Sequence, residues 1–147
     1  MFRKLPKNAI VAISCKDECS RKLSGAVKGM MKQGGSKAIS GLKYRESFAF
    51  VGVVGAKTAV EKKADIKHRT QVTRWFTMGG GRKVSKKIYR RAVGKSRTRR
   101  GGWYSLRVES AGYESGNYAR FSLGGKRIRM KNGRGLNIVA WHPVSFK

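Results

Sequence analysis

Positive charge limits how this chain can fold more than any other feature of its sequence. The 35 lysines and arginines stand against 7 aspartates and glutamates, which gives a formal charge of +28 over 147 residues. Self-repulsion of this kind destabilises a compact state unless phosphate, sulfate or carboxylate groups on a partner neutralise it. The core must therefore come from the few apolar segments, and we expect the basic surface to meet a polyanion.

The first half of the chain contains two apolar runs with a helical stripe between them. Residues 9–13 and 48–54 have the pattern of short buried strands. Between them, Ser20 or Ser24 can cap a helix that Gly34 ends. The stripe at helical spacing consists of Leu23, Ala26, Val27, Met30 and Met31. Strand, helix and strand in this order are typical of a crossover unit, so we predict that the two strands run parallel.

The second half has the alternation of β-strands. Residues 104–109 and 118–123 alternate apolar and polar positions, and Gly124-Gly125 predicts a hairpin turn into residues 126–130. A last apolar run covers residues 136–141. Alternation implies one buried and one wet face, and the basic residues expected on the wet faces are Arg107, Arg120, Arg127 and Arg129.

A basic middle separates the two halves. Residues 79–102 are bounded by glycines and join halves 1–66 and 103–147. Without enough apolar surface to fold unaided, this segment is predicted to be an arm or loop that orders on contact with a polyanion. Its candidate contact residues are Arg82, Lys83, Lys86, Lys87, Arg90, Arg91, Lys95, Arg97, Arg99 and Arg100. The fold class that follows is α/β: a single compact mixed-sheet sandwich domain with one or more packed helices and this arm.

Catalytic and metal-binding patterns are weak in this sequence. Cys15 and Cys19, with His68 and His142 far along the chain, do not supply the four spaced ligands of a zinc site, so free or buried thiols are favoured over metal binding or a disulfide. His68 lies between Lys67 and Arg69, where a solvated or phosphate-facing side chain is favoured over a general base. We predict no enzyme activity, no catalytic residues, no metal and no cofactor.

Three segments together resemble the interleukin-like EMT-inducer domain, also called the GG domain. They are residues 5–12 running on to Asp17-Glu18, residues 44–52 (Tyr-Arg-Glu-Ser-Phe-Ala-Phe-Val-Gly), and residues 133–139 (Gly-Arg-Gly-Leu-Asn-Ile-Val). The family includes cytokine-like secreted proteins and the stem domain of an O-mannose N-acetylglucosaminyltransferase. The resemblance implies a compact α/β sandwich that binds and does not catalyse, with carbohydrate recognition in some members.

The order of these segments departs from the family. The piece that resembles residues 133–139 comes first in the family and last here, which looks like a circular permutation. The resemblance implies that Gly133, Arg134 and Gly135 form a structural turn feeding a strand beside residues 9–13. The family's cysteine pairs are absent, and Phe48 replaces its usual tryptophan, so the fold transfers better than the function.

Two functions compete on this basis. The first is a structural component of a large assembly, such as a minor capsid protein or nucleoprotein particle, in contact with nucleic acid or another polyanion and with other proteins. The alternative is a carbohydrate-binding or cytokine-like module for anionic glycans. We expect no membrane-spanning segment and no secretory signal, hence a location inside a cell or virion. Trp75, Phe76 and Tyr89 could stack on bases, although core positions are favoured for them.

Overall fold

The computed structural model describes residues 5–77 and 103–141, and strands make up most of this part of the chain. The strands are β1 (Ile10–Asp17), β2 (Ser47–Val53), β3 (Ala59–Ala64), β4 (Arg69–Thr77), β5 (Trp103–Gly112), β6 (Tyr118–Leu123), β7 (Lys126–Arg127) and β8 (Gly135–Trp141). The α-helix is α1 (Gly25–Gln33), and the 3₁₀ turns are η2 (Ser20–Lys22), η3 (Ile39–Gly41) and η4 (Tyr113–Ser115).

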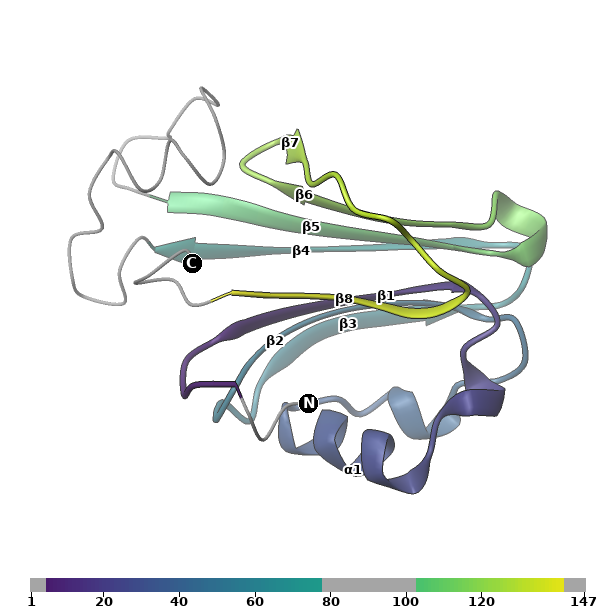
Figure 1. The fold of residues 1–147 in the computed structure, drawn as a ribbon, viewed down its shortest axis with the longest axis horizontal. Helices are drawn as coiled ribbons and strands as arrows, with labels where there is room; N and C mark the ends of the chain where they lie inside the picture. The colour runs from purple at the N-terminus through teal and green to yellow at the C-terminus, as the bar shows by residue number, and fades with distance from the viewer. Residues whose placement is uncertain (1–4, 78–102, 142–147) are drawn as a thin grey trace.

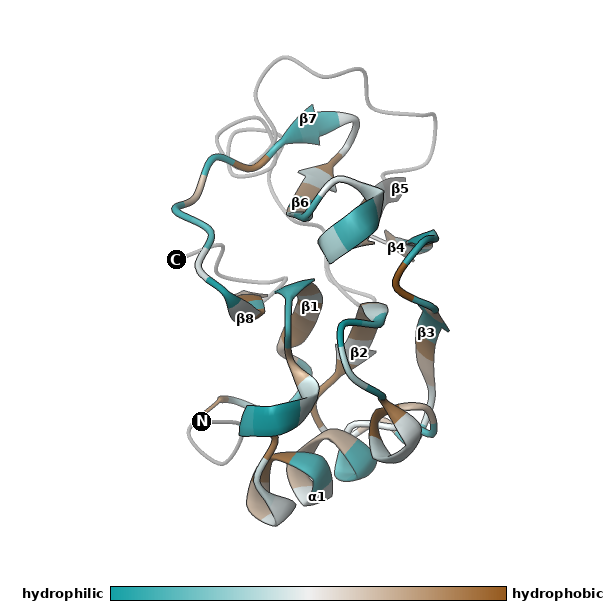
Figure 2. Cartoon of the chain, turned by 90° about the vertical axis from the view of Figure 1, so that its right-hand side faces the viewer, coloured by the Kyte–Doolittle hydropathy of each residue, from teal (hydrophilic) through white to brown (hydrophobic). Residues whose placement is uncertain are grey.

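The strands form two stacked layers (Figure 1). One layer has the order β8-β1-β2-β3 and the other β4-β5-β6-β7, and neighbours within each layer are antiparallel. Two parallel pairs, Lys16 with Ala111 and Asp17 with Gly112, join the layers into one eight-stranded sheet. Seen along the strands, the layers lie one above the other and α1 covers the outside of the β1-β2 layer (Figure 2).

Ser110 occupies the point where β1 leaves β2 to pair with β5. The β1–β2 register ends at Ser14 opposite Ala49. One residue further along, the Ser110 hydroxyl donates to the Cys15 carbonyl at 2.6 Å and accepts from the Phe48 N–H at 3.0 Å. The β1–β2 register ends before these two backbone groups, so they do not bond to each other. The fully buried Ser110 hydroxyl from β5 is the hydrogen-bond partner of both.

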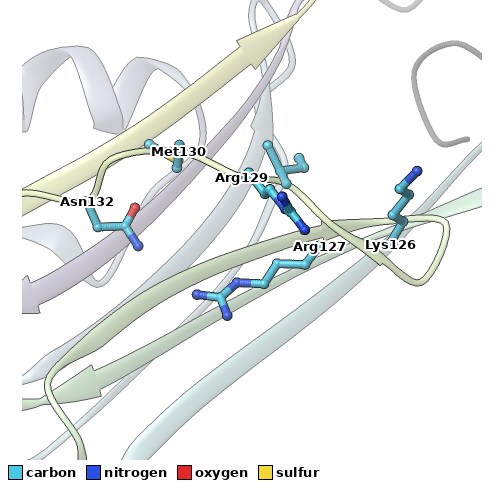
Figure 3. Close-up of a pocket in the computed structure, with 6 residues that line it drawn as sticks. Lys126, Arg127, Arg129, Met130 and Asn132 are labelled. Atoms are coloured by element: carbon cyan, nitrogen blue, oxygen red, sulfur yellow. The ribbon is translucent and has the colours of Figure 1, made fainter.

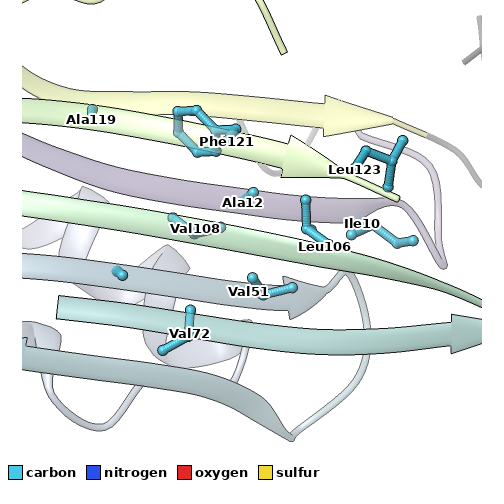
Figure 4. Close-up of a cluster of buried hydrophobic side chains, with 10 residues drawn as sticks. Ile10, Ala12, Val51, Val72, Leu106, Val108, Ala119, Phe121 and Leu123 are labelled. Atoms are coloured by element: carbon cyan, nitrogen blue, oxygen red, sulfur yellow. The ribbon is translucent and has the colours of Figure 1, made fainter. Parts of the chain in front are cut away.

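The main core lies between the two layers (Figure 4). Alternate residues of β1, β2, β4, β5 and β6 point into it, as a half-buried strand requires. Its buried members are Ile10, Ala12, Ala49, Val51, Val72, Leu106, Val108, Ala119, Phe121 and Leu123. Each large aliphatic or aromatic side chain in such a core contributes about 1.5–3 kcal/mol on burial.

A second apolar cluster lies between α1 and the other face of the β1-β2 layer. It contains Met31, Phe48 and Phe50, all fully buried. The helix is the one predicted from the apolar stripe: Ser24 Oγ accepts from the Val27 N–H at 3.3 Å, and Gly34 is the C-cap. Residues 9–13, buried on both faces, separate the two clusters, which explains why that run is continuously apolar.

The α/β class predicted from the sequence is wrong. The described residues hold eight strands and a single nine-residue α-helix, and β1 and β2 are adjacent and antiparallel instead of parallel. The described part of the chain is a mostly β sandwich with one α-helix packed on the outside.

The reversed direction of β2 follows from the path between the strands. A Cβ on Gly35, just past the helix, would lie 2.9 Å from the Lys57 carbonyl oxygen, so α1 ends beside the β2–β3 turn. The chain then returns beside β3, where the Glu61 carboxylate accepts from two backbone N–H groups at 2.5 and 2.8 Å. At the starting end, Glu18 Oε2 accepts from the Arg45 N–H at 2.7 Å. The segment between β1 and β2 therefore ends beside the end of β1, where it started, so β2 runs antiparallel to β1.

The two cysteines form a disulfide, Cys15–Cys19, with the Cα atoms 6.0 Å apart. The prediction of free or buried thiols is wrong. The chain reverses at Asp17, whose φ is +62°, and this reversal brings Cys19 back over Cys15. The bond closes the turn that leads from β1 into η2.

The segment 133–135 precedes β8, which pairs with β1 along its length, from Gly135 opposite Lys16 to Trp141 opposite Ile10. Gly135 has φ +101°, a conformation that costs a residue with a Cβ extra energy. The Asn137 side chain closes the turn, because it accepts from the Gly133 N–H at 2.8 Å and donates to the Gly133 carbonyl at 2.9 Å.

Candidate anion-binding surface

The outer face of the β4-β5-β6-β7 layer carries three of the four arginines predicted on wet strand faces. The register sets Thr73, Arg107, Ser122 and Arg127 in one row across the four strands. The next row consists of Gln71, Glu109 and Arg120. Their inward neighbours Val72, Val108 and Phe121 are core residues, so alternation fixes which way these side chains point.

Two of these arginines are already engaged by neighbours. Arg107 donates to Gln71 Oε1 at 2.5 Å and to Glu109 Oε1 at 3.2 Å, so its charge is partly compensated. The Arg120 guanidinium lies 3.9 Å from the Tyr118 ring centroid, a cation–π contact. Arg107 is therefore partly neutralised by Glu109, whereas the ring contact of Arg120 leaves its charge uncompensated.

The remaining two arginines lie on a hollow of about 460 Å³ formed by the segment after the β6–β7 hairpin (Figure 3). The Ile128 N–H donates to the Phe121 carbonyl at 2.8 Å, and Ile128 and Met130 pack against the main core. Alternation then leaves Arg127, just before Ile128, and Arg129, between Ile128 and Met130, exposed. The hollow is lined by Lys126, Arg127, Ile128, Arg129, Met130 and Asn132.

Asn132 anchors the segment that forms the hollow. Its Nδ2 donates to the Ala119 carbonyl of β6. Its Oδ1 is buried and has no hydrogen-bond partner among the described residues, so it is not open to a ligand in the hollow.

The hollow thus combines three cations, one amide and an apolar floor, and no acidic side chain is among the described residues that line it. Guanidinium groups bind carboxylate and sulfate through paired N–H donors, while the Lys126 ammonium acts as a point charge. Such a hollow suits an anion that also presents an apolar surface.

Sequence reasoning placed Arg127 and Arg129 correctly on an exposed face but missed the hollow and Lys126 and Asn132 within it. The ten basic residues of segment 82–100 lie outside the described residues. Of the aromatic residues considered for base stacking, two are described by the structure. Trp75 is 45% exposed on the outer face, whereas Phe76 packs against the main core.

The turn residues Gly133, Arg134 and Gly135 lie apart from the basic hollow, at the β8 end of the same connection. Arg134 Nε is 3.1 Å from Asp17 Oδ2, so this arginine ties the turn to the end of β1. His68, near the β3–β4 connection, has Nδ1 2.7 Å from Asp65 Oδ1 and is exposed. The hydrogen bond from His68 lowers the pKa of the Asp65 carboxyl.

In the described residues, the chain is a small β-sandwich with a basic surface hollow. Residues 1–56 match the family model of the interleukin-like EMT inducer, so the resemblance stated from the sequence is confirmed. The matched segment holds β1, α1 and β2, whereas residues 133–139 lie beyond it. No curated protein matches the chain.

In the part of the chain that the structure describes, no helix is both long and apolar enough to cross a bilayer. Within the same residues, no group of three or more His, Cys, Asp or Glu side chains is placed to hold a metal ion.

Proposed function

We propose that this protein is a non-enzymatic binding module of the interleukin-like EMT-inducer type that holds an acidic glycan in the basic hollow. The observation that carries the proposal is the lining of the hollow: Lys126, Arg127 and Arg129 line it together with the apolar side chains Ile128 and Met130. A uronic acid or a sulfated sugar offers the matching groups, since it carries an anion and an apolar ring face.

The lining favours a sugar over a nucleobase. Proteins that bind single-stranded nucleic acid stack the bases on aromatic side chains. No aromatic side chain lines the basic hollow among the described residues. The +28 charge would still attract any polyanion over the whole surface, so affinity alone does not identify the ligand. A role in a large nucleoprotein or capsid assembly, and a location inside a cell or virion, stay predictions from composition.

The test compares a site variant with a charge-matched control. Arg127→Gln with Arg129→Gln removes two charges from the hollow, and Lys57→Gln with Lys62→Gln removes two exposed charges elsewhere. Binding of a uronic-acid oligosaccharide, an uncharged oligosaccharide and a single-stranded RNA of similar charge is measured by calorimetry near physiological salt.

We expect the hollow variant to bind the acidic oligosaccharide at least about tenfold more weakly than the control variant, since two charge-assisted contacts are lost. RNA binding should fall to the same small extent in both variants. Equal loss of glycan affinity in the two variants, or glycan binding no tighter than that of the uncharged sugar, contradicts the proposal. Preferential loss of RNA binding in the hollow variant would favour the nucleoprotein function instead.

A further inference from the structure

A second hollow, with a lining unlike the first, lies between α1 and β8. Its volume is about 330 Å³, within the range of small-ligand sites. Its walls are mainly the apolar side chains Leu23, Val27, Met30, Leu136 and Ile138. It opens on the opposite layer from the basic hollow, so the acidic glycan proposed above does not account for it.

The apolar walls of this hollow extend the second apolar cluster, but their side chains stay partly exposed to solvent. Val27, Leu136 and Ile138 pack against that core and are only partly buried, and Met30 is partly buried as well. Removing apolar surface from water is favourable by about 0.8 kcal/mol for each methylene group buried. The unbranched Met30 side chain adapts readily to the shape of a ligand.

The charges lie at one end of this hollow. Lys22 and Arg134 belong to its lining, and no acidic side chain does among the described residues. Gly135, next to Arg134, is opposite Lys16, whereas Ile138 is opposite Ile13, three residues back along β1. The cationic end is therefore the end where β1 finishes, and the apolar walls extend away from it along the strand.

Asp17 partly neutralises the charge of Arg134, one of the two cations. Arg134 is paired with this carboxylate, but Lys22 is exposed and has no ion pair among the described residues. Lys22 and Arg134 are thus the charged groups available to an anion at this end. The site combines apolar walls with a cationic end.

We propose that this hollow binds a free single-chain amphiphile with an anionic head, of the fatty-acid type. The head group contacts Lys22 and Arg134, and the alkyl chain lies against Val27, Met30 and Ile138. A recessed hollow of this size suits one alkyl chain in solution better than a flat bilayer surface, which would need protruding apolar groups.

Calorimetric titration with laurate below its micelle-forming concentration tests the proposal. Any anion binds weakly to a +28 surface, so chain length and head charge have to separate the site from the background. Decanoate shortens the chain by two methylenes and should bind about 15-fold more weakly. Dodecyl maltoside keeps the chain but removes the charge, and should bind at least about tenfold more weakly.

Two variant pairs locate the site. Met30→Glu places a carboxylate on the apolar wall, and Gly29→Glu places one on the same helix, where an added Cβ meets no described atom within 4 Å. Lys22→Glu reverses the charge at the cationic end, and Lys32→Glu makes the same change at an exposed position outside the lining. We expect losses of at least about tenfold in laurate affinity for Met30→Glu and Lys22→Glu only.

Thermal unfolding of each variant checks that it is folded, and Lys22→Glu, an exposed change, keeps the test decisive if Met30→Glu fails to fold. Equal effects within each pair, or binding of dodecyl maltoside as tight as that of laurate, overturn the proposal. Binding to anionic phospholipid vesicles with no binding of monomeric laurate also overturns it, because the surface would then dock on membranes.

Discussion

Ser110 provides the sharpest test of how the two layers are joined. Its hydroxyl is the hydrogen-bond partner of the Cys15 carbonyl and of the Phe48 N–H, at the point where β1 passes from β2 to β5. Ser110→Ala leaves both backbone groups buried without that partner. Such a group costs about 1–3 kcal/mol, and the carbonyl tolerates it better than the N–H. We therefore expect a loss of about 2–4 kcal/mol in the free energy of unfolding.

Two serine variants serve as controls for this loss. Ser14 is equally buried but makes one such bond, to the Glu109 carbonyl at 2.6 Å, so Ser14→Ala should cost about 1 kcal/mol. Ser122 lies on the outer face, and Ser122→Ala should change stability by less than about 0.5 kcal/mol. Urea unfolding followed by circular dichroism measures all three, and the midpoint should shift without a change in slope. A Ser110→Ala loss no larger than that of Ser14→Ala would refute this account of the junction.

Three further predictions concern the turn, acid stability and the basic segment. Gly135→Val, at φ +101°, should lower stability by about 1–2 kcal/mol. An added Cβ meets no described atom within 4 Å at either position, but Gly133 does not have a positive φ, so Gly133→Val should cost less in the same unfolding assay. Burial opposes ionisation of Glu18, but hydrogen bonds from Ser20, Arg45 and Arg21 outweigh it and lower its pKa. Its contribution to stability is therefore present at neutral pH and lost as the pH falls below 4.5, so wild type and Glu18→Gln should converge in an acid titration of unfolding. Replacing the basic residues of segment 82–100 by Ser should weaken heparin binding and flatten its salt dependence, and an unchanged salt dependence would show that this segment is not the main binding element.

The strands that were predicted from the sequence, β1, β2 and β5 to β8, each carry their own burial pattern, whereas β3 and β4 were not predicted. Residues 9–13 and 48–54 are apolar on every position because a core covers each face of β1 and β2. The alternation over residues 118–123 likewise corresponds to inward Phe121 and outward Arg120 in β6. Helix α1 was predictable too, since its stripe, its Ser24 cap and its Gly34 end are local signals.

The direction of β2 was not predictable, because it depends on contacts between residues distant in the sequence. Glu18 and Glu61 fix the segment between β1 and β2 by accepting hydrogen bonds from its backbone N–H groups. No sequence pattern predicts either of these bonds. The disulfide was missed for a similar reason. A spacing of four suits several structures, and the positive φ of Asp17 selects the one that brings Cys19 to Cys15.

The candidate site shows the same division between local and distant signals. Alternation alone predicted that Arg127 and Arg129 would be exposed. The hollow also needs Asn132 to reach the Ala119 carbonyl on β6, and that contact depends on the path of the segment from β7 to β8. Residues that line a site because of a loop path, such as Asn132, have no periodicity to reveal them.

The position of the basic hollow decides how far the family match can be used. The match covers residues 1–56, which supply β1, α1 and β2, and every residue lining the basic hollow lies between 126 and 132. The matched part therefore accounts for two strands and the helix of one layer and leaves the chemistry of that hollow unassigned. The apolar hollow differs, because Lys22, Leu23, Val27 and Met30 belong to the matched segment while Leu136 and Ile138 come from β8. If the apolar hollow binds laurate as proposed, its site depends on a strand from outside the match, so a chain that shares only the first 56 residues would lack one wall of it.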